Sequence, residues 1–212
     1  MKLYIYFLVL FSFVAFGVNA QTFPSELWHD GQIKLTDGSI KNGNIKYDLD
    51  RQAIQLQIGD RTEAYDASQI ISFSFLQEST KTRRTFYSLP YAIQNNYKRP
   101  VFFEVIVAGK MTLLAREYVV IRNSPTTSSL NNRYRYSDYP NFRESRSYLA
   151  HKMFFAKEDG VIRESSGKTN DVLNQFGNAR AELKKYVKKE RLKLDRLQDV
   201  AKLVHHFNQE VN

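Results

Sequence analysis

The chain has 212 residues, with 31 Lys and Arg against 22 Asp and Glu, which gives a formal net charge of +9. It contains no cysteine, nine glycines and five prolines, which excludes disulfide scaffolds, thiolate metal sites, cysteine nucleophiles, lipobox-anchored lipoproteins and collagen-like polymers. Hydrophobic residues make up 42% of the chain, too many for a wholly disordered protein. The basic excess is compatible with nucleic acids, anionic envelope polymers or acidic lipids as partners, and it selects none of them.

The first 20 residues are typical of a secretory signal peptide. Lys2 precedes an apolar run over residues 3–18, and the small residue Ala20 stands at the expected cleavage point. The run is short for a membrane span of about 20 residues, and no cluster of Lys or Arg follows it. An uncleaved N-terminal anchor is the alternative. We therefore expect residues 1–20 to be removed and the mature chain to be exported to the periplasm or the medium.

Residues 28–76 carry a regular β-strand pattern. Apolar and polar residues alternate in five short runs, and Asp37-Gly38 is a strong turn signal between the first two. Gly43 stands inside the second run, where a glycine marks a bulge or a bend. Residues 66–69 favour a single helical turn before the last run. These features predict a five-stranded SH3-like small β-barrel over residues 21–78.

The segment from His29 to Ile45 resembles the Sm-like subclass of these barrels, because a strand, an Asp-Gly turn and a strand bent at glycine follow one another. The resemblance implies the fold alone, since small barrels carry many unrelated functions. Sm-like proteins bind RNA, but residues 21–78 have a net charge of −4, and phosphate contacts need the opposite sign. We expect a structural or protein-contacting barrel, in which Trp28 plugs one mouth rather than forming an exposed ligand platform.

A second antiparallel β region is predicted over residues 79–167. The strongest apolar run in the chain, residues 101–107, is followed by a three-residue turn and by a second run that ends at residue 121. Residues 148–157 and 161–164 flank a Glu-Asp-Gly turn and form a later hairpin. The segment 79–167 has a net charge of +8, so the basic excess of the chain is concentrated after the predicted barrel.

Two basic features of this region are candidate anion contacts. The stretch 123–147 lacks periodicity and is predicted to be a flexible loop rich in Tyr and Arg, with a surface loop of no function as the alternative. Its candidate contacts, which can stack on bases or sugars or pair with anions, are Arg133, Tyr134, Arg135 and Tyr136. The pair Arg83-Arg84 could clamp a carboxylate or a phosphate, but a solvated edge strand guarded by charge is the favoured interpretation.

Residues 168–212 are predicted to form a basic helical tail of two or three short helices. Apolar residues recur at helical spacing, and Gly177 fits the position that follows the first helix. The candidate anion contacts of the tail are Lys184, Lys185, Lys188 and Lys189. A solvated basic helix face is the alternative. His205 and His206 are adjacent and point in different directions on a helix, so they do not favour a shared metal.

Three blocks of sequence together carry a resemblance to a protein family. They are Trp28-His29-Asp30-Gly31-Gln32-Ile33 with Asp37-Gly38, Phe102-Phe103-Glu104-Val105 leading to Thr112-Leu113-Leu114-Ala115-Arg116-Glu117, and the lysine-rich tail. The set is similar to uncharacterised secreted proteins of Bacteroidota-type bacteria. The resemblance implies export across an inner membrane, and it implies no activity.

The fold class expected from these features is α+β: the small barrel, a second antiparallel sheet region and the helical tail. The chain has no nucleophile elbow, P-loop, dinucleotide-binding or His-Glu-x-x-His motif, so we predict a non-enzymatic protein without metal or cofactor. The favoured function is an envelope or secreted interaction or scaffold protein, with a protein or envelope polymer as partner. The alternative is an anion-binding module for nucleic acid, lipopolysaccharide or anionic lipid that uses the basic middle and tail. Nucleic acid is the disfavoured partner, whereas peripheral membrane contact and an oligomer stay open.

Overall fold

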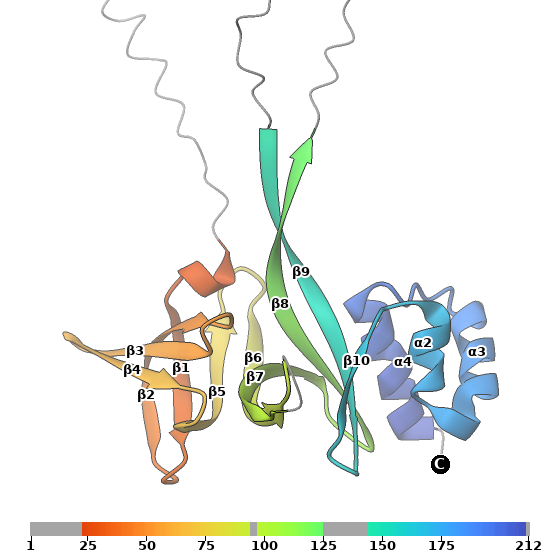
Figure 1. The fold of residues 1–212 in the computed structure, drawn as a ribbon, viewed down its shortest axis with the longest axis horizontal. Coiled ribbons are helices and arrows are strands. Elements are labelled where there is room, and N and C mark those ends of the chain that lie inside the picture. The colour runs from red at the N-terminus through yellow and green to blue at the C-terminus, as the bar shows by residue number, and fades with distance from the viewer. Residues whose placement is uncertain (1–22, 94–96, 125–143, 211–212) are drawn as a thin grey trace, which may run out of the picture.

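The computed structural model describes residues 23–93, 97–124 and 144–210 (Figure 1). Ten antiparallel strands form one sheet in the order β10-β9-β8-β7-β6-β5-β1-β2-β3-β4. A short 3-10 helix, η2 (Pro24–Glu26), precedes the sheet, and a helical part follows it. Within these ranges, no helix is both long and apolar enough to cross a membrane. The predicted signal peptide, residues 1–20, lies outside the described residues.

The strands and helices follow the expected runs closely. The strands are β1 (His29–Leu35), β2 (Ile40–Asp48), β3 (Ala53–Ile58), β4 (Arg61–Asp66), β5 (Ile70–Gln77), β6 (Thr82–Tyr91), β7 (Arg99–Val107), β8 (Met111–Ser124), β9 (Glu144–Lys157) and β10 (Ile162–Ser165). The helical part comprises α2 (Thr169–Asn174), the 3-10 helix η3 (Gly177–Ala179), α3 (Arg180–Lys189) and α4 (Leu197–Glu210). Gly177 has a positive φ of 55°, but it begins η3, two positions after the C-cap residue Gln175, and Phe176 takes the position that directly follows α2.

The closed small barrel predicted over residues 21–78 is wrong. Among the described residues β4 pairs with β3 alone, whereas β5 pairs with β1 on one side and with β6 on the other. The sheet therefore stays open and continues from the first five strands into β6–β10, so the second sheet region predicted over residues 79–167 is part of the same sheet. The physical reason lies in the core, because Phe86 of β6 and Phe102 of β7 take the place that a closed barrel would have filled from its own strands.

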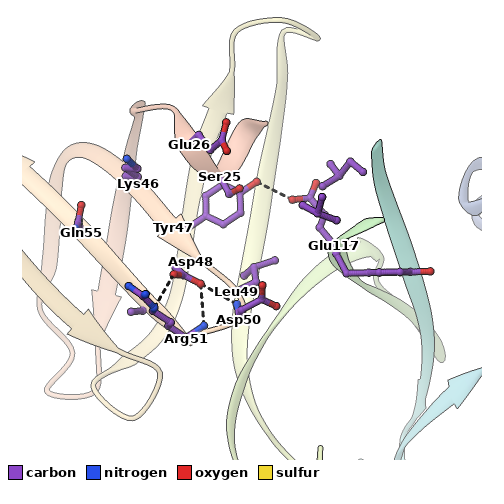
Figure 2. A pocket seen from close by; sticks show the side chains of 14 residues that line it. Ser25, Glu26, Lys46, Tyr47, Asp48, Leu49, Asp50, Arg51, Gln55 and Glu117 are labelled. Carbon is purple, nitrogen blue, oxygen red and sulfur yellow. Dashed lines mark hydrogen bonds and ion pairs between the residues drawn. The ribbon is translucent and has the colours of Figure 1, made fainter. Parts of the chain in front are cut away.

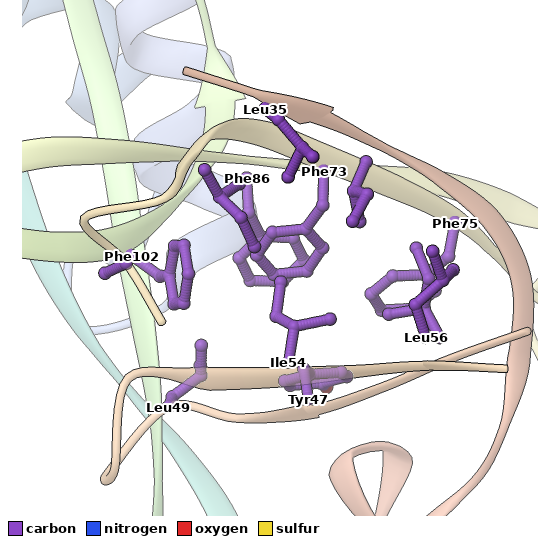
Figure 3. Packing of buried hydrophobic residues seen from close by; sticks show 13 residues of the cluster. Leu35, Tyr47, Leu49, Ile54, Leu56, Phe73, Phe75, Phe86 and Phe102 are labelled. Carbon is purple, nitrogen blue, oxygen red and sulfur yellow. The ribbon is translucent and has the colours of Figure 1, made fainter. Parts of the chain in front are cut away.

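Buried residues of β1–β3 and β5–β7 form the first core, which we call the meander core (Figure 3). The rings of Phe73 and Phe86 stack with their centroids 4.5 Å apart, and Phe102 meets Phe73 edge-on at 5.2 Å. Tyr47 of β2 and Ile54 of β3 belong to the same cluster and face these rings from across the core. Strands far apart in the sheet order therefore share one core, and the sheet curls without closing.

Trp28 does not plug this core, contrary to expectation, because 42% of its surface is exposed. Its neighbour His29 is buried instead. The His29 ring stacks on Phe75 with centroids 4.4 Å apart, and its Nε2 lies 2.7 Å from the carbonyl oxygen of Pro24. The strand alternation beginning at His29 turns one of the two adjacent side chains inward, and the imidazole finds a polar partner there.

The second core, which we call the helix core, lies between the helical part and the first half of β8 with the last half of β9 (Figure 1). Met111 and Leu113 of β8 meet apolar residues of all three α-helices in this cluster. Asn208 fastens α4 to the sheet, because its side-chain amide accepts from the Met111 N–H and donates to the Met111 carbonyl, both at 2.9 Å. Gly109 is required beside it, since a Cβ there would collide with the Asn208 amide.

Candidate functional site

The strands β7 and β8 separate after Ala115. Their pairing runs from Val107–Leu113 to Glu104–Ala115, whereas β8 and β9 remain paired as far as Ser124–Glu144. On the other side, β10 pairs only with residues 153–156 of β9. Residues 116–124 and 144–152 therefore form a two-stranded ribbon with no other neighbouring strand among the described residues. We call it the distal ribbon, and Figure 1 shows it projecting beyond the sheet.

The turn between β2 and β3 inserts at the point where β7 and β8 separate. The side-chain oxygen of Gln52 accepts from the main-chain N–H of Phe102 at 2.6 Å, and the Arg116 guanidinium donates to the Leu49 carbonyl at 3.1 Å. Gln52 itself has a positive φ of 55°. The turn thus provides a partner for a β7 amide and for Arg116 of β8, where a continued β7–β8 ladder would otherwise lie.

A buried cluster of Arg84, Glu104, Glu117 and Tyr47, which we call the charged bridge, joins β2, β6, β7 and β8 at the same place. Arg84 Nε and Nη2 donate to the two oxygens of Glu104 at 2.7 and 2.5 Å, and Nη2 also lies 2.7 Å from Glu117 Oε1. The Tyr47 hydroxyl donates to Glu117 Oε2 at 2.8 Å and accepts from Arg84 Nη1 at 3.2 Å. One guanidinium therefore neutralises part of the charge of two buried carboxylates.

The charged bridge lies between the meander core and the helix core. Phe102, Glu104 and Ile106 alternate along one face of β7, and Phe102 belongs to the meander core while Ile106 packs against the helix core. Glu104 lies between them. A buried ion pair contributes little net stability, but the removal of one partner leaves an uncompensated buried charge. The bridge therefore adds side-chain contacts between β2, β6, β7 and β8 to the strand ladders that already join the two regions.

The electrostatic environment keeps Tyr47 neutral and Glu117 and Arg84 charged. Burial raises the pKa of the Tyr47 phenol. Burial also disfavours ionisation of Glu117, but hydrogen bonds from His151, Arg84 and Tyr47 outweigh it and lower the pKa of that carboxyl. Burial opposes the charge of Arg84 as well, and its pKa is nevertheless raised by the paired carboxylates. General acid–base catalysis requires a pKa near the working pH, and these shifts run in the opposite direction.

Three possible metal ligands also meet at the bridge. Oxygen atoms of Glu104 and Glu117 and a ring nitrogen of His151 lie within 4.8 Å of one another. His151 Nε2 is 3.5 Å from Glu117 Oε1. However, the Arg84 guanidinium already contacts both carboxylates, so a metal ion would have to displace a buried cation. The cluster fits an ion-pair network better than a metal centre.

A groove of about 480 Å³ lies between the distal ribbon and the β2–β3 region, directly beyond the charged bridge (Figure 2). It is lined by Ser25, Glu26, Lys46, Tyr47, Asp48, Leu49, Asp50, Arg51, Ala53, Gln55, Glu117, Tyr118, Val119 and Leu149. The ribbon contributes the apolar side chains of Val119 and Leu149, whereas most lining residues from η2 and the β2–β3 region are polar or charged. Its volume falls within the range of small-ligand sites, about 300–1,000 Å³.

The distal ribbon carries large apolar side chains in water. Glu117, Val119 and Ile121 follow one another on one face of β8, and the exposed fractions of Val119 and Ile121 are 46% and 65%. On the other face, the Arg122 guanidinium lies 5.0 Å from the centre of the Tyr148 ring. An isolated two-stranded hairpin is at best marginally stable in water, and strand edges of this kind are usually covered or charged. The ribbon is therefore the described surface that most clearly lacks a partner.

None of the predicted anion contacts that fall within the described residues lines this groove. Arg133, Tyr134, Arg135 and Tyr136 lie outside the described residues. The lysines of the tail, Lys184, Lys185, Lys188 and Lys189, are all exposed on α3. The predicted loop 123–147 is shorter than expected, because β8 extends to Ser124 and β9 begins at Glu144. Its remainder, residues 125–143, also lies outside the described residues.

The charged bridge was missed in the sequence. The interpretation of Arg83-Arg84 as a solvated edge strand is wrong for Arg84, which is buried in β6 with strands on both sides. Its partners stand 20 and 33 positions later in the chain, so no local pattern reveals them. One signal was present: Glu104 interrupts the most apolar run of the chain, and a buried charge requires a partner. No protein-family model, curated protein or solved structure matches this chain.

Proposed function

We propose that this is an exported, non-enzymatic interaction protein and that the distal ribbon, with the groove beside it, is its contact surface. The observation that carries the proposal is the exposure of Val119 and Ile121 on a ribbon with open edges. Contiguous exposed apolar side chains on a soluble chain mark interaction sites. The charged bridge supports the proposal, because it anchors the base of the ribbon in a fixed position.

The test is site-specific photo-crosslinking in the cells that produce the protein. A photoreactive phenylalanine derivative placed at position 121 is expected to give a discrete cross-linked product. The matched control is position 40 in β2, where Ile40 is 58% exposed but lies away from the groove lining. The product at position 121 should disappear when Val119→Lys is added. Equal products from positions 121 and 40, or a product that persists with Val119→Lys, contradicts the proposal.

A second candidate function is anion binding through α3. The four lysines Lys184, Lys185, Lys188 and Lys189 are exposed, and within the described ranges none of them forms an ion pair with a carboxylate. Clusters of this size on one helix attract anionic surfaces. Replacement of all four by Gln should abolish retention on vesicles that contain phosphatidylglycerol, and binding of the unaltered protein should fall steeply with salt. Retention that is unchanged in the quadruple variant excludes this candidate.

A further inference from the structure

The edge of β8 that faces the groove is available for pairing with another strand. Beyond Ala115, β8 is hydrogen-bonded to β9 on one side and, among the described residues, has no strand on the other. Glu117, Tyr118 and Val119 of this edge line the groove. A strand edge offers a row of main-chain donors and acceptors, and an extended peptide can satisfy them by strand addition.

We propose that the groove binds an extended, basic segment of a partner protein, which adds as a strand to β8 along residues 117–121. The proposal rests on the proposed function and names its partner chemistry. Five residues of an extended chain span about 17 Å. A segment of this length would have the main chain of β8 on one side and the β2–β3 region on the other. Strand addition explains the position of the groove, which begins where the β7–β8 ladder ends.

The apolar face of the ribbon determines which side chains the segment carries. Val119, Leu149 and Ile121 lie on one face of the ribbon, because Val119 pairs with Leu149 and Ile121 lies two residues further along β8. Every second side chain of an added strand would pack beside this row. Apolar residues in alternate positions of the segment would therefore cover the exposed surface of Val119 and Ile121.

The charge of the groove favours a basic segment. Asp48 is paired with Arg51 at 3.7 Å and accepts main-chain N–H groups of its own turn, and the charge of Glu117 is partly neutralised by Arg84. Glu26, whose Oε2 also accepts from the Phe23 main-chain N–H, and Asp50 stand against the single lysine of the groove, Lys46. Lys or Arg in the alternate, outward positions of the segment would meet Glu26 and Asp50. A segment with Glu in those positions would be repelled.

The experiment uses the full mature chain and three fluorescein-labelled hexapeptides in anisotropy titrations at low salt. The first peptide alternates Val and Lys, the second alternates Val and Glu, and the third is the Val-Lys peptide with alternate amides N-methylated. The Val-Lys peptide is expected to bind at least about tenfold more tightly than either control, because the second has the wrong charge and the third cannot pair along one edge.

Variants test the position of the binding site. Val119→Lys and Asp50→Lys should each weaken binding of the Val-Lys peptide at least about tenfold. The matched control Ile40→Lys introduces the same charge on an exposed position of β2 and should leave binding unchanged. Circular dichroism and thermal unfolding establish that each variant is folded before it is titrated. Equal binding of all three peptides, or equal loss in Ile40→Lys, overturns strand addition.

The outcomes separate this inference from the proposed function. If position 121 cross-links specifically and no peptide binds, the distal ribbon is a contact surface and strand addition is overturned. If light scattering shows a dimer that Val119→Lys dissociates, the occupant is a second copy of the chain, which also overturns the peptide proposal. If the Val-Lys peptide binds and only the groove variants lose it, both proposals are supported.

Discussion

The two halves of the β8–β9 pair both carry apolar side chains on one face and have opposite surroundings. In the base half, Leu113 is fully buried between strand and helices, and Met153 of β9 packs into the same helix core. In the distal half, Val119 and Ile121 occupy the same face of the same strand and remain exposed. The charged bridge marks the boundary, because Glu117 stands between Ala115 and Val119 on that face. Apolar residues therefore continue along β8 past the point where the fold needs them.

This difference shows which apolar residues of the β8–β9 pair contribute to the stability of the fold. Folding removes the apolar side chains of the base half from water, which stabilises the folded state. The exposed side chains of the distal half contribute little to that free energy. Polar substitutions of Val119 and Ile121 should therefore cost the fold little. The proposed partner contact would account for their apolar character. Four predictions test the comparison, from the largest expected effect to the smallest.

The largest change in unfolding free energy is expected at the charged bridge. Arg84→Met leaves Glu104 and Glu117 buried without their cation, and the loss of one partner of a buried pair costs about 3–5 kcal/mol. Urea unfolding at neutral pH measures the free energy of unfolding. The matched control is Arg83→Met, at the adjacent exposed position of β6, which should change it by less than about 0.5 kcal/mol. Equal effects at both positions would show that the bridge does not join the cores.

Truncation of one apolar side chain in each half of the β8–β9 pair should have clearly different effects on the unfolding free energy. Leu113→Ala removes a fully buried side chain from the helix core and should cost about 2–5 kcal/mol. Ile121→Ala removes a side chain that is 65% exposed and should cost less than about 0.5 kcal/mol. The free energies come from the same urea titrations. A loss in Ile121→Ala close to that in Leu113→Ala would mean that the distal ribbon is part of a core.

The attachment of α4 to the base half gives a smaller effect. Asn208→Ala removes both hydrogen bonds to the main chain of Met111 and leaves a partly buried N–H and carbonyl without these partners, at a cost of about 1–3 kcal/mol. Gln209→Ala, at the exposed neighbouring position, is the control and should be nearly neutral. Thermal unfolding followed by circular dichroism ranks the two variants. If Asn208→Ala is as stable as the control, these hydrogen bonds do not hold α4 to the sheet.

The pH dependence of the boundary has a defined sign. The pKa of the Glu117 carboxyl is lowered in the folded protein, so its stabilising contribution is present above the ordinary Glu pKa of about 4.3 and is lost as pH falls towards the folded value. The difference in unfolding free energy between the unaltered protein and Glu117→Gln should therefore be constant at neutral pH and shrink below about pH 4.3. A difference that grows on acidification contradicts the assigned ion pair.

The sequence predicted local structure well and long-range pairing poorly. The turn at Asp37-Gly38 and the alternation around Ile33 depend on neighbouring residues, so the strands were placed correctly. Closure of the barrel depended on whether β5 pairs with β4 or β6, and Phe86, outside the predicted barrel, decides it. No local pattern contains that information.

The candidate site was beyond local patterns for the same reason. Arg84 and Glu117 are 33 positions apart, and the groove combines η2, the β2–β3 region and the distal ribbon. Trp28 and His29 show a second limit of prediction from sequence. Strand alternation requires one of these two adjacent side chains to turn inward, but it does not determine which, and the prediction that the larger Trp28 is buried was wrong. Exposure of Val119 and Ile121 was equally hidden, since their pattern is the same as that of the buried Met111 and Leu113.

Amide hydrogen exchange along β8, measured with and without the Val-Lys hexapeptide, tests the central claim most directly. Amides of Leu113–Ala115 should exchange slowly in both states, because this part of β8 is held between β7 and β9 and packs on the helix core. Within residues 117–121, the amides that point to the open edge should exchange faster in the free protein and become protected when the peptide is bound. Equal protection of both halves in the free protein, or no change on peptide binding, would contradict the assignment of the distal ribbon as an open contact surface.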